Sequence, residues 1–303
     1  MLRRTLIIMC LSGFATSAVL AEPGAGPSAE DRKIIGELEL REMSAPLSAN
    51  PGWAPRKVVA TVPPFMTAGI PDFVTRLRAA AGPVELVIDD SGDTTPAPEL
   101  LAEADALVGF CSPTALQRAG DRLLWLHNFF VGMDRCAGVT QSELSGRVFT
   151  NGKRLSGPTI AEHAVAMILS LARGLPAYQR AQMDARWDRS VSAGVSFGEL
   201  QDKTLLVVGL GGIGTQVARR AHGLGMRVIA TRRSSREGPD FVDYVGLGDE
   251  LPKLAARSHV VVNALPLTAE TTGLFDAQFF RTMPRGSIFV SVGRGKSTVT
   301  GEL

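Results

Sequence analysis

The stretch Thr204-Leu-Leu-Val-Val208-Gly209-Leu210-Gly211-Gly212-Ile213-Gly214 decides the fold of this chain, because an apolar strand runs directly into a glycine turn that opens a helix over Thr215–His222. Gly209 allows the tight turn, Gly211 lets the backbone approach a pyrophosphate, and Gly214 lets helix and strand pack closely. The amino terminus of the helix offers free N–H groups to phosphates. We therefore predict a dinucleotide-binding unit whose contacts come from Gly209, Gly211, Gly212, Ile213 and Gly214.

The next strand ends in Thr231-Arg232-Arg233-Ser234, about seventeen residues after Gly214. A fold that prefers NAD usually carries an acidic residue here, which accepts hydrogen bonds from ribose hydroxyls and would repel the extra phosphate of NADP. Guanidinium groups instead pair with that phosphate. We predict an NADP site formed by Arg232, Arg233 and Ser234, with NAD as the less favoured cofactor; solvated surface arginines are the alternative.

The chain has 303 residues, of which 45% are hydrophobic and 20% are charged, so it is long enough for two domains that each bury a core. The 32 basic and 30 acidic residues are interspersed and leave a net charge of +2. That distribution lacks the basic patch of a nucleic-acid-binding protein. We assign no nucleic-acid partner and no metal site.

The amino terminus is typical of a secretory signal. Arg3 and Arg4 precede a mostly apolar run from Leu6 to Leu20, and Ala21 ends a small-residue cleavage site. We predict a signal peptide over residues 1–21, an exported or periplasmic protein, and no membrane contact after cleavage. An uncleaved anchor, or a cytoplasmic protein with a misassigned start, remains as an alternative. Residues 22–56 are interpreted as a linker or extension.

Short apolar runs alternate with stretches of helical length such as Pro71–Ala81, which indicates a parallel sheet covered on both faces. This pattern predicts a first domain over residues 57–150, with strands at Val58–Val62, Val84–Ile88, Ala106–Phe110, Leu123–Leu126 and Val148–Thr150.

A second α/β domain is predicted over residues 151–303. It starts with a long, largely buried helix from Pro158 to Gly174, followed by a polar connection from Tyr178 to Gln201. Its predicted strands are Thr204–Val208, Arg227–Ala230, His259–Ala264 and Ser287–Ser291.

Three cysteines are present, and Cys10 would leave with the signal peptide. Cys111 and Cys136 could pair in an oxidising compartment if their Cα atoms come within bridging distance. We favour two buried, unpaired thiols.

Four motifs in order carry a resemblance to a known family. They are the glycine turn, the segment Asn151–Arg173, the segment Ala264-Leu265-Pro266-Leu267-Thr268-Ala-Glu-Thr271, and Val292-Gly293-Arg294-Gly295. From about residue 57 to the end, the chain resembles the D-isomer-specific 2-hydroxyacid dehydrogenases. The resemblance implies two doubly wound parallel-sheet domains: a flavodoxin-like substrate domain and a Rossmann NAD(P)-binding domain, here without its last elements.

The same resemblance implies an oxidoreductase that transfers a hydride between NADP(H) and a small 2-keto or 2-hydroxy acid of the glyoxylate or hydroxypyruvate type. Backbone N–H groups of Val131 and Gly132 would hold the substrate carboxylate, and Arg294 would be the catalytic arginine. A homodimer built around the long helix is also implied. The resemblance gives contacts with the nicotinamide half of the cofactor to Leu265, Pro266, Thr271, Val292 and Gly293.

The family takes its proton from a histidine paired with a glutamate, both well beyond the arginine, whereas this chain ends nine residues after Arg294. We expect a truncated copy of a longer protein, without the general acid and with an apolar sheet edge exposed. A non-catalytic, nucleotide-responsive binding protein of the same fold is the alternative. Packing or surface roles are expected for His127, His163, His222 and His259.

Overall fold

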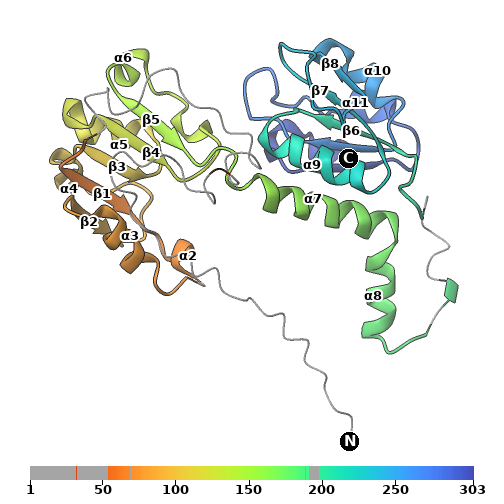
Figure 1. Cartoon of the computed structure of the whole chain (residues 1–303), viewed down its shortest axis with the longest axis horizontal. Helices are drawn as coiled ribbons and strands as arrows, with labels where there is room; N and C mark the ends of the chain where they lie inside the picture. The colour runs from red at the N-terminus through yellow and green to blue at the C-terminus, as the bar shows by residue number, and fades with distance from the viewer. Residues whose placement is uncertain (1–31, 33–53, 69, 188, 191–197) are drawn as a thin grey trace, which may run out of the picture.

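The computed structural model describes residue 32 and residues 54–68, 70–187, 189–190 and 198–303. The predicted signal peptide and nearly all of the predicted extension lie outside these ranges. Two α/β lobes are described, and a long helix, α7, runs along the second lobe (Figure 1).

The first lobe is built on five parallel strands in the order β2-β1-β3-β4-β5, which is the flavodoxin-like order. The predicted parallel sheet is confirmed. One strand, β4, begins two residues later than predicted, because its ladder starts where Trp125 pairs with Ala106. The strands are β1 Lys57–Thr61, β2 Glu85–Asp89, β3 Ala106–Gly109, β4 Trp125–Asn128 and β5 Val148–Asn151; the helices are α2 Pro64–Thr67, α3 Phe73–Ala81, α4 Pro98–Ala102, α5 Pro113–Ala119 and α6 Gln141–Leu144.

The second lobe also holds five parallel strands, in the order β10-β9-β6-β7-β8, which corresponds to the order 3-2-1-4-5 of a Rossmann sheet. The predicted fold class is confirmed. Its strands are β6 Thr204–Val208, β7 Arg227–Thr231, β8 Tyr244–Gly246, β9 Val260–Asn263 and β10 Ile288–Ser291; its helices are α9 Gly212–Gly223, α10 Leu251–Ala255 and α11 Ala277–Thr282.

Both faces of the second sheet are buried. Alternate residues of one strand enter different cores: Leu205 and Val207 of β6 pack in the cluster that includes α9, whereas Leu206 and Val208 pack with α10 and α11. Since side chains of a strand alternate between faces, a sheet covered by helices on both sides needs apolar residues at every position. This requirement explains the continuous apolar runs in the sequence.

Two predictions about the helical segment before this sheet are wrong. Helix α7, Gly157–Ala172, packs against α9 and β10 through a single stripe that includes Ala161, Ala164 and Ile168. The opposite side, with His163, is exposed, so the helix is not largely buried.

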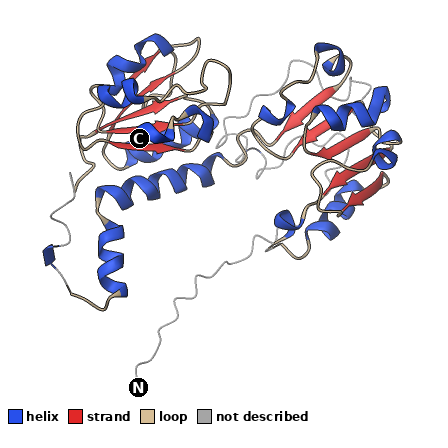
Figure 2. Cartoon of the chain, turned by 180° about the vertical axis from the view of Figure 1, so that it is seen from behind, coloured by secondary structure: helices blue, strands red, loops and turns tan. Residues whose placement is uncertain are grey.

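The stretch after Tyr178 is not simply a polar connection either, because helix α8 spans Leu175–Met183 and extends away from both lobes (Figures 1 and 2). Its Ala, Gln and Arg residues favour a helix despite their low hydrophobicity.

The prediction of two unpaired thiols is also wrong. Cys111 follows β3, Cys136 ends the short 3-10 helix Asp134–Cys136 beyond β4, and the two are joined by a disulfide with Cα atoms 5.2 Å apart. The two strands are neighbours in the sheet, so the loops that leave their carboxyl ends lie side by side. That proximity is a property of strand order and is invisible in the cysteine spacing.

Within the described ranges, no helix combines the length and the apolar character that crossing a membrane requires.

Candidate active site

The glycine turn lies at the point where strand order reverses in the second sheet. Strand β6 pairs with β7 on one side and with β9 on the other, so the loops after β6 and β9 leave the carboxyl edge next to each other. Gly209 has a φ of +95°, and a Cβ at this position would lie 3.0 Å from Leu265 Cδ2 and 3.2 Å from the Ala264 carbonyl oxygen. Ligands of doubly wound sheets bind at such a reversal.

Gly211 and Gly214 meet different surroundings. A Cβ on Gly214 would overlap the carbonyl oxygen of Gly209 and lie 2.9 Å from Val207 Cγ1, so only glycine lets α9 pack this closely on β6. A Cβ on Gly211, at the amino-terminal cap of α9, would meet no described atom within 4 Å. Open space therefore lies beside Gly211 at the start of α9, the end of a helix where a phosphate is expected to bind.

The two arginines at the end of β7 differ in burial and in hydrogen bonding. The Arg232 backbone N–H donates to the Gly246 carbonyl oxygen at 2.9 Å, while its side-chain Nε is buried and has no hydrogen-bond partner among the described residues. Arg233 and Ser234 are exposed. A buried donor without a partner is uncommon in native proteins. An anionic group at this position would satisfy it, so these residues fit the extra phosphate of NADP.

The loops after β9 and β10 are held by Asn263, a fully buried residue that the sequence analysis missed. Its Nδ2 donates to Ser291 Oγ at 3.0 Å and to Ser297 Oγ at 2.8 Å, and its Oδ1 accepts from the Leu265 N–H at 3.0 Å. A Cβ on Gly293 would lie 2.7 Å from the Leu265 carbonyl oxygen. The only signal in the sequence is a polar residue that ends a run of three valines.

The turn after Pro266 is closed by its own hydroxyls. Thr271 Oγ1 donates to the Pro266 carbonyl oxygen at 2.7 Å and accepts from the Thr268 N–H at 2.7 Å. The structure therefore places all the sequence-assigned cofactor residues at one edge of the second sheet, on the turn and loops that follow β6, β7, β9 and β10.

Arg294 reaches across to the first lobe. Its Nε lies 3.1 Å from Asp134 Oδ1, and the two side chains are 39% and 35% exposed. A Cβ on Gly132 would overlap its guanidinium group, so Gly132 and Arg294 lie in direct contact. The structure thus brings together residues separated by about 160 positions. The sequence analysis assigned no role to Asp134.

Two asparagine side chains bind the carbonyl groups of the loop that holds Val131 and Gly132. Asn151 Nδ2 donates to the Val131 carbonyl oxygen at 3.0 Å, and Asn128 Nδ2 donates to that of Gly132 at 3.1 Å. The N–H groups of Val131 and Gly132 find no acceptor within the part of the chain that the structure describes. Two backbone donors and one guanidinium group are therefore available to a carboxylate.

The histidines have packing or surface environments. His127 lies within β4, not after it as predicted; its Nδ1 is 2.9 Å from Thr150 Oγ1, and burial lowers its pKa. His163 and His222 are exposed. His259 precedes β9, and its Nδ1 accepts the Thr204 N–H at 3.1 Å.

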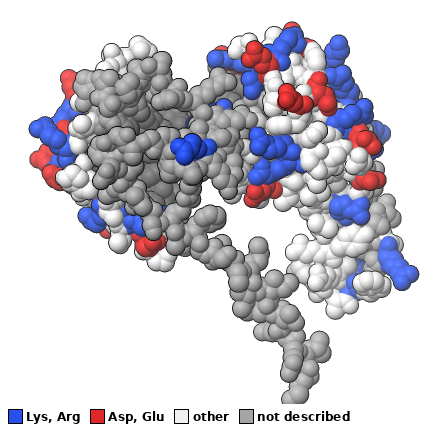
Figure 3. Space-filling view, viewed as in Figure 1, with Lys and Arg blue, Asp and Glu red and all other residues white. Residues whose placement is uncertain are grey.

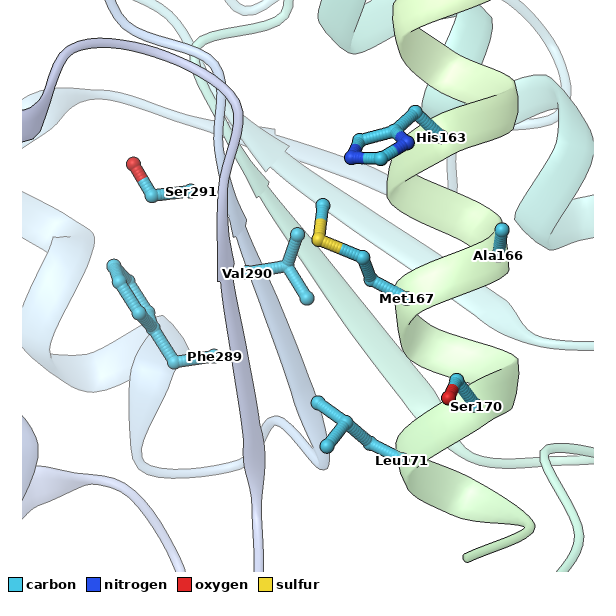
Figure 4. Close-up of a pocket in the computed structure, with 8 residues that line it drawn as sticks. All are labelled: His163, Ala166, Met167, Ser170, Leu171, Phe289, Val290 and Ser291. Carbon is cyan, nitrogen blue, oxygen red and sulfur yellow. The ribbon is translucent and has the colours of Figure 1, made fainter. Parts of the chain in front are cut away.

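A groove of about 490 Å³ lies between α7 and β10, at the edge of the second sheet (Figure 4). It is mostly apolar, with Met167 and Leu171 on one side and Phe289 and Val290 on the other. None of the sequence-assigned site residues lines it. In the described ranges there is also no group of three His, Cys, Asp or Glu residues that could hold a metal ion.

Comparisons with known proteins agree with this architecture. Residues 165–303 match the family described as D-isomer specific 2-hydroxyacid dehydrogenase, NAD binding domain. A glyoxylate reductase from Korarchaeum cryptofilum is 31% identical over 205 residues, which is 65% of this chain and 60% of that protein. The chain spans between 30% and 60% of the length of three of its curated relatives.

Two solved structures superimpose over 82% of this chain and 76% of their own. The D-isomer specific 2-hydroxyacid dehydrogenase family protein from Aeromonas salmonicida has a TM-score of 0.66 and 28% identity. The D-isomer specific 2-hydroxyacid dehydrogenase from Xanthobacter autotrophicus, in complex with NADPH and MES, has a TM-score of 0.65 and 26% identity. Residues 165–303 thus match the NAD binding domain of the D-isomer specific 2-hydroxyacid dehydrogenase family, and the described fold resembles that of two solved members of the family.

Proposed function

We propose that this chain binds NADP(H) at the carboxyl edge of its second sheet and holds a small 2-keto or 2-hydroxy acid of the glyoxylate or hydroxypyruvate type against it. The reaction would be an oxidoreduction in which a hydride passes between cofactor and acid. The observation that carries the proposal is the contact of Arg294 with the Gly132 loop, beside two free backbone N–H groups. The glyoxylate reductase among the relatives and the NADPH complex among the similar structures support it.

For the cofactor, the start of α9 would hold the pyrophosphate through backbone N–H groups, with Gly211 leaving the space. Arg232, Arg233 and Ser234 would hold the extra phosphate. The nicotinamide ring, when bound, supplies or accepts the hydride. Its half of the cofactor would lie along Leu265, Pro266, Thr271, Val292 and Gly293.

For the substrate, the N–H groups of Val131 and Gly132 would donate to the carboxylate. The Arg294 fork would hold the carboxylate and the carbonyl oxygen together and stabilise the negative charge that develops on that oxygen. Asp134 orients the fork through its ion pair with the Arg294 Nε. None of the four histidines is placed in the proton transfer.

The substrate half of the proposal is tested by binding of oxamate, an unreactive analogue of a 2-keto acid, to the chain saturated with NADPH, measured by calorimetry. We expect binding that Arg294→Ala weakens about 10- to 100-fold, because hydrogen bonds to charged groups contribute about 1.5–3 kcal/mol. Arg285→Ala, which changes an exposed arginine in the turn before β10, is the matched control and should leave binding unchanged.

Absence of oxamate binding, with NADPH still bound, would favour the alternative function: a nucleotide-responsive binding protein without catalysis. An unchanged oxamate affinity in Arg294→Ala would remove the arginine from the substrate site. NADPH oxidation upon addition of glyoxylate or hydroxypyruvate, followed by absorbance, separates an enzyme from a binding protein directly.

We further propose a homodimer formed through the arm made by α7 and α8. This arm exposes four large apolar side chains. Single exposed apolar residues are normal on a protein surface, but a group of them is typical of an interaction site. They are Leu171, Leu175, Tyr178 and Met183. Sedimentation velocity should show a dimer, and Leu175→Glu combined with Tyr178→Glu should give a monomer; a monomeric wild type would refute this assembly.

Export remains a proposal that rests on residues 1–21, which lie outside the described ranges. Cell fractionation followed by amino-terminal sequencing tests it. A chain that begins at Glu22 outside the cytoplasm is expected, and an intact cytoplasmic chain would contradict it.

A further inference from the structure

The loop that leaves β7 is anchored to β8 at both of its ends. At its start, the Arg232 N–H donates to the Gly246 carbonyl oxygen at 2.9 Å. At its end, Arg236 Nη1 lies 2.7 Å from Glu250 Oε1 and donates to the Tyr244 hydroxyl at 3.0 Å. The segment 232–236, called here the phosphate loop, is therefore closed against its neighbouring strand.

Glu250 is the centre of the second anchor. Besides the ion pair with Arg236, its carboxylate accepts the Tyr244 hydroxyl and the Leu247 N–H, the latter at 2.9 Å. The hydrogen bond from Tyr244 is the largest of the interactions that lower the pKa of Glu250 to about 2, so the group is charged at neutral pH. The Arg257 guanidinium lies over the Tyr244 ring, 5.6 Å from its centroid.

Arg236 follows the two arginines of the predicted phosphate site, but its guanidinium group already forms an ion pair with Glu250. Arg233 and Ser234 lie exposed between the two anchors, and the Arg232 Nε remains without a partner among the described residues. Arg236 therefore stabilises the shape of the loop, whereas Arg232 and Arg233 are available to bind an anion.

We propose that Glu250 is a positioning residue for cofactor selectivity: by binding Arg236 it holds the phosphate loop in the shape that presents Arg232 and Arg233 to the extra phosphate of NADP. This inference rests on the proposed NADP site. A loop held in its binding shape before the ligand arrives loses less conformational entropy on binding. NAD lacks the phosphate, so its affinity depends far less on the loop.

Glu250→Gln tests the role of the charge with little change in shape. The amide oxygen still accepts from the Leu247 N–H, whereas the ion pair with Arg236 is lost. The matched control is Glu162→Gln, which removes an ion pair of similar length, 2.9 Å to Arg220, between α7 and α9 in the same lobe. Calorimetric titration should show that Glu250→Gln lowers the affinity for NADPH 3- to 10-fold and changes the affinity for NADH by less than about 2-fold. Glu162→Gln should leave both affinities unchanged.

A second measurement does not depend on the cofactor. Amide hydrogen exchange of the nucleotide-free protein should be faster over residues 232–238 in Glu250→Gln than in the wild type, and unchanged there in Glu162→Gln. Arg236→Gln should reproduce both the faster exchange and the selective loss of NADPH affinity.

The outcomes separate the inference from the function it rests on. A wild type that does not prefer NADPH refutes the NADP site and the inference with it. A wild type that prefers NADPH, with the same preference in Glu250→Gln or with unchanged exchange of the loop, refutes the inference alone. Tighter NADPH binding by Glu250→Gln, or NADPH loss confined to Arg236→Gln, would make Arg236 a phosphate ligand and also overturn it.

Discussion

At the scale of single residues, Gly211 and Gly214 show how two glycines of one motif serve different ends. A methyl group on Gly214 would overlap backbone that has no room to move, whereas one on Gly211 would enter open space, where we propose that the pyrophosphate binds. We expect Gly214→Ala to cost about 1–3 kcal/mol of unfolding free energy, as overpacking usually does. Gly211→Ala should leave the melting temperature unchanged and weaken NADPH binding at least 10-fold.

Thermal melting and calorimetry on the same preparations check this pair. A Gly211→Ala protein that binds NADPH as tightly as the wild type would place the pyrophosphate elsewhere. Equal melting temperatures for Gly214→Ala and the wild type would contradict the close packing of α9 on β6.

Gly132 gives a prediction for the substrate side. A Cβ there would overlap the guanidinium of Arg294, which is the far end of a flexible side chain, so the fold can adapt while the arginine is displaced. Gly132→Ala should therefore weaken oxamate binding at least 10-fold and leave NADPH affinity and the melting temperature unchanged. A variant that binds oxamate normally would show that the contact is not part of the substrate site.

The residues that sequence could assign are those within continuous motifs, such as the glycine turn and the segment around Arg294. Asn263 and Asp134 could not be assigned in this way. The role of Asn263 depends on Ser291 and Ser297, and that of Asp134 on an arginine about 160 positions away. Their partners are defined only once the strands are ordered.

At the scale of elements, the disulfide between Cys111 and Cys136 ties the end of β3 to the loop that carries Gly132 and Asp134. Its two cysteines are 25 residues apart, and cross-linking a loop of that length stabilises a fold by about 3 kcal/mol. In urea unfolding, the double variant Cys111→Ala/Cys136→Ala should have a free energy of unfolding lower than that of the wild type by about this amount. A loss below about 0.5 kcal/mol would show that the bond does not constrain the protein.

A pH dependence follows from His259, next to the first residue of β9. Burial, with the charges of Lys203 and Arg227, lowers its pKa below 6.5, and its Nδ1 can accept the Thr204 N–H only while unprotonated. Below about pH 6.5 the unfolded chain binds a proton that the folded chain does not, so stability falls as the pH falls. Urea unfolding at pH 7.5 and 5.5 should show this loss, and His259→Gln should reduce it. An identical loss in the variant would exclude His259 as a source.

Elements with an apolar run were predictable, and those without one were not. Strand β8 is only Tyr244–Gly246, and it exists because it pairs with β7. Helix α8 is mostly exposed, so no hydrophobic pattern indicated it. In α7, the sequence predicted the buried stripe that packs on α9. It did not predict the exposed side of the helix, because small and apolar residues occur on both sides.

At the scale of the whole molecule, the residues of the proposed site come from both lobes. The proposed cofactor residues lie on the second sheet and the loop proposed to bind the carboxylate lies on the first, and the ion pair of Arg294 with Asp134 joins the two lobes. Figure 3 shows basic and acidic side chains interspersed over the visible surface of the second lobe, in agreement with the small net charge. Local binding residues, not the overall field, must therefore select the cofactor.

The most direct test of the central claim is calorimetric titration of the purified chain with NADPH and NADH, comparing the wild type with Arg232→Asp. We expect the wild type to bind NADPH at least 10-fold more tightly than NADH. The substitution should invert that preference, because a carboxylate repels the extra phosphate and accepts hydrogen bonds from the ribose. Tighter binding of NADH by the wild type, an unchanged preference in Arg232→Asp, or no binding of either nucleotide would contradict the NADP site.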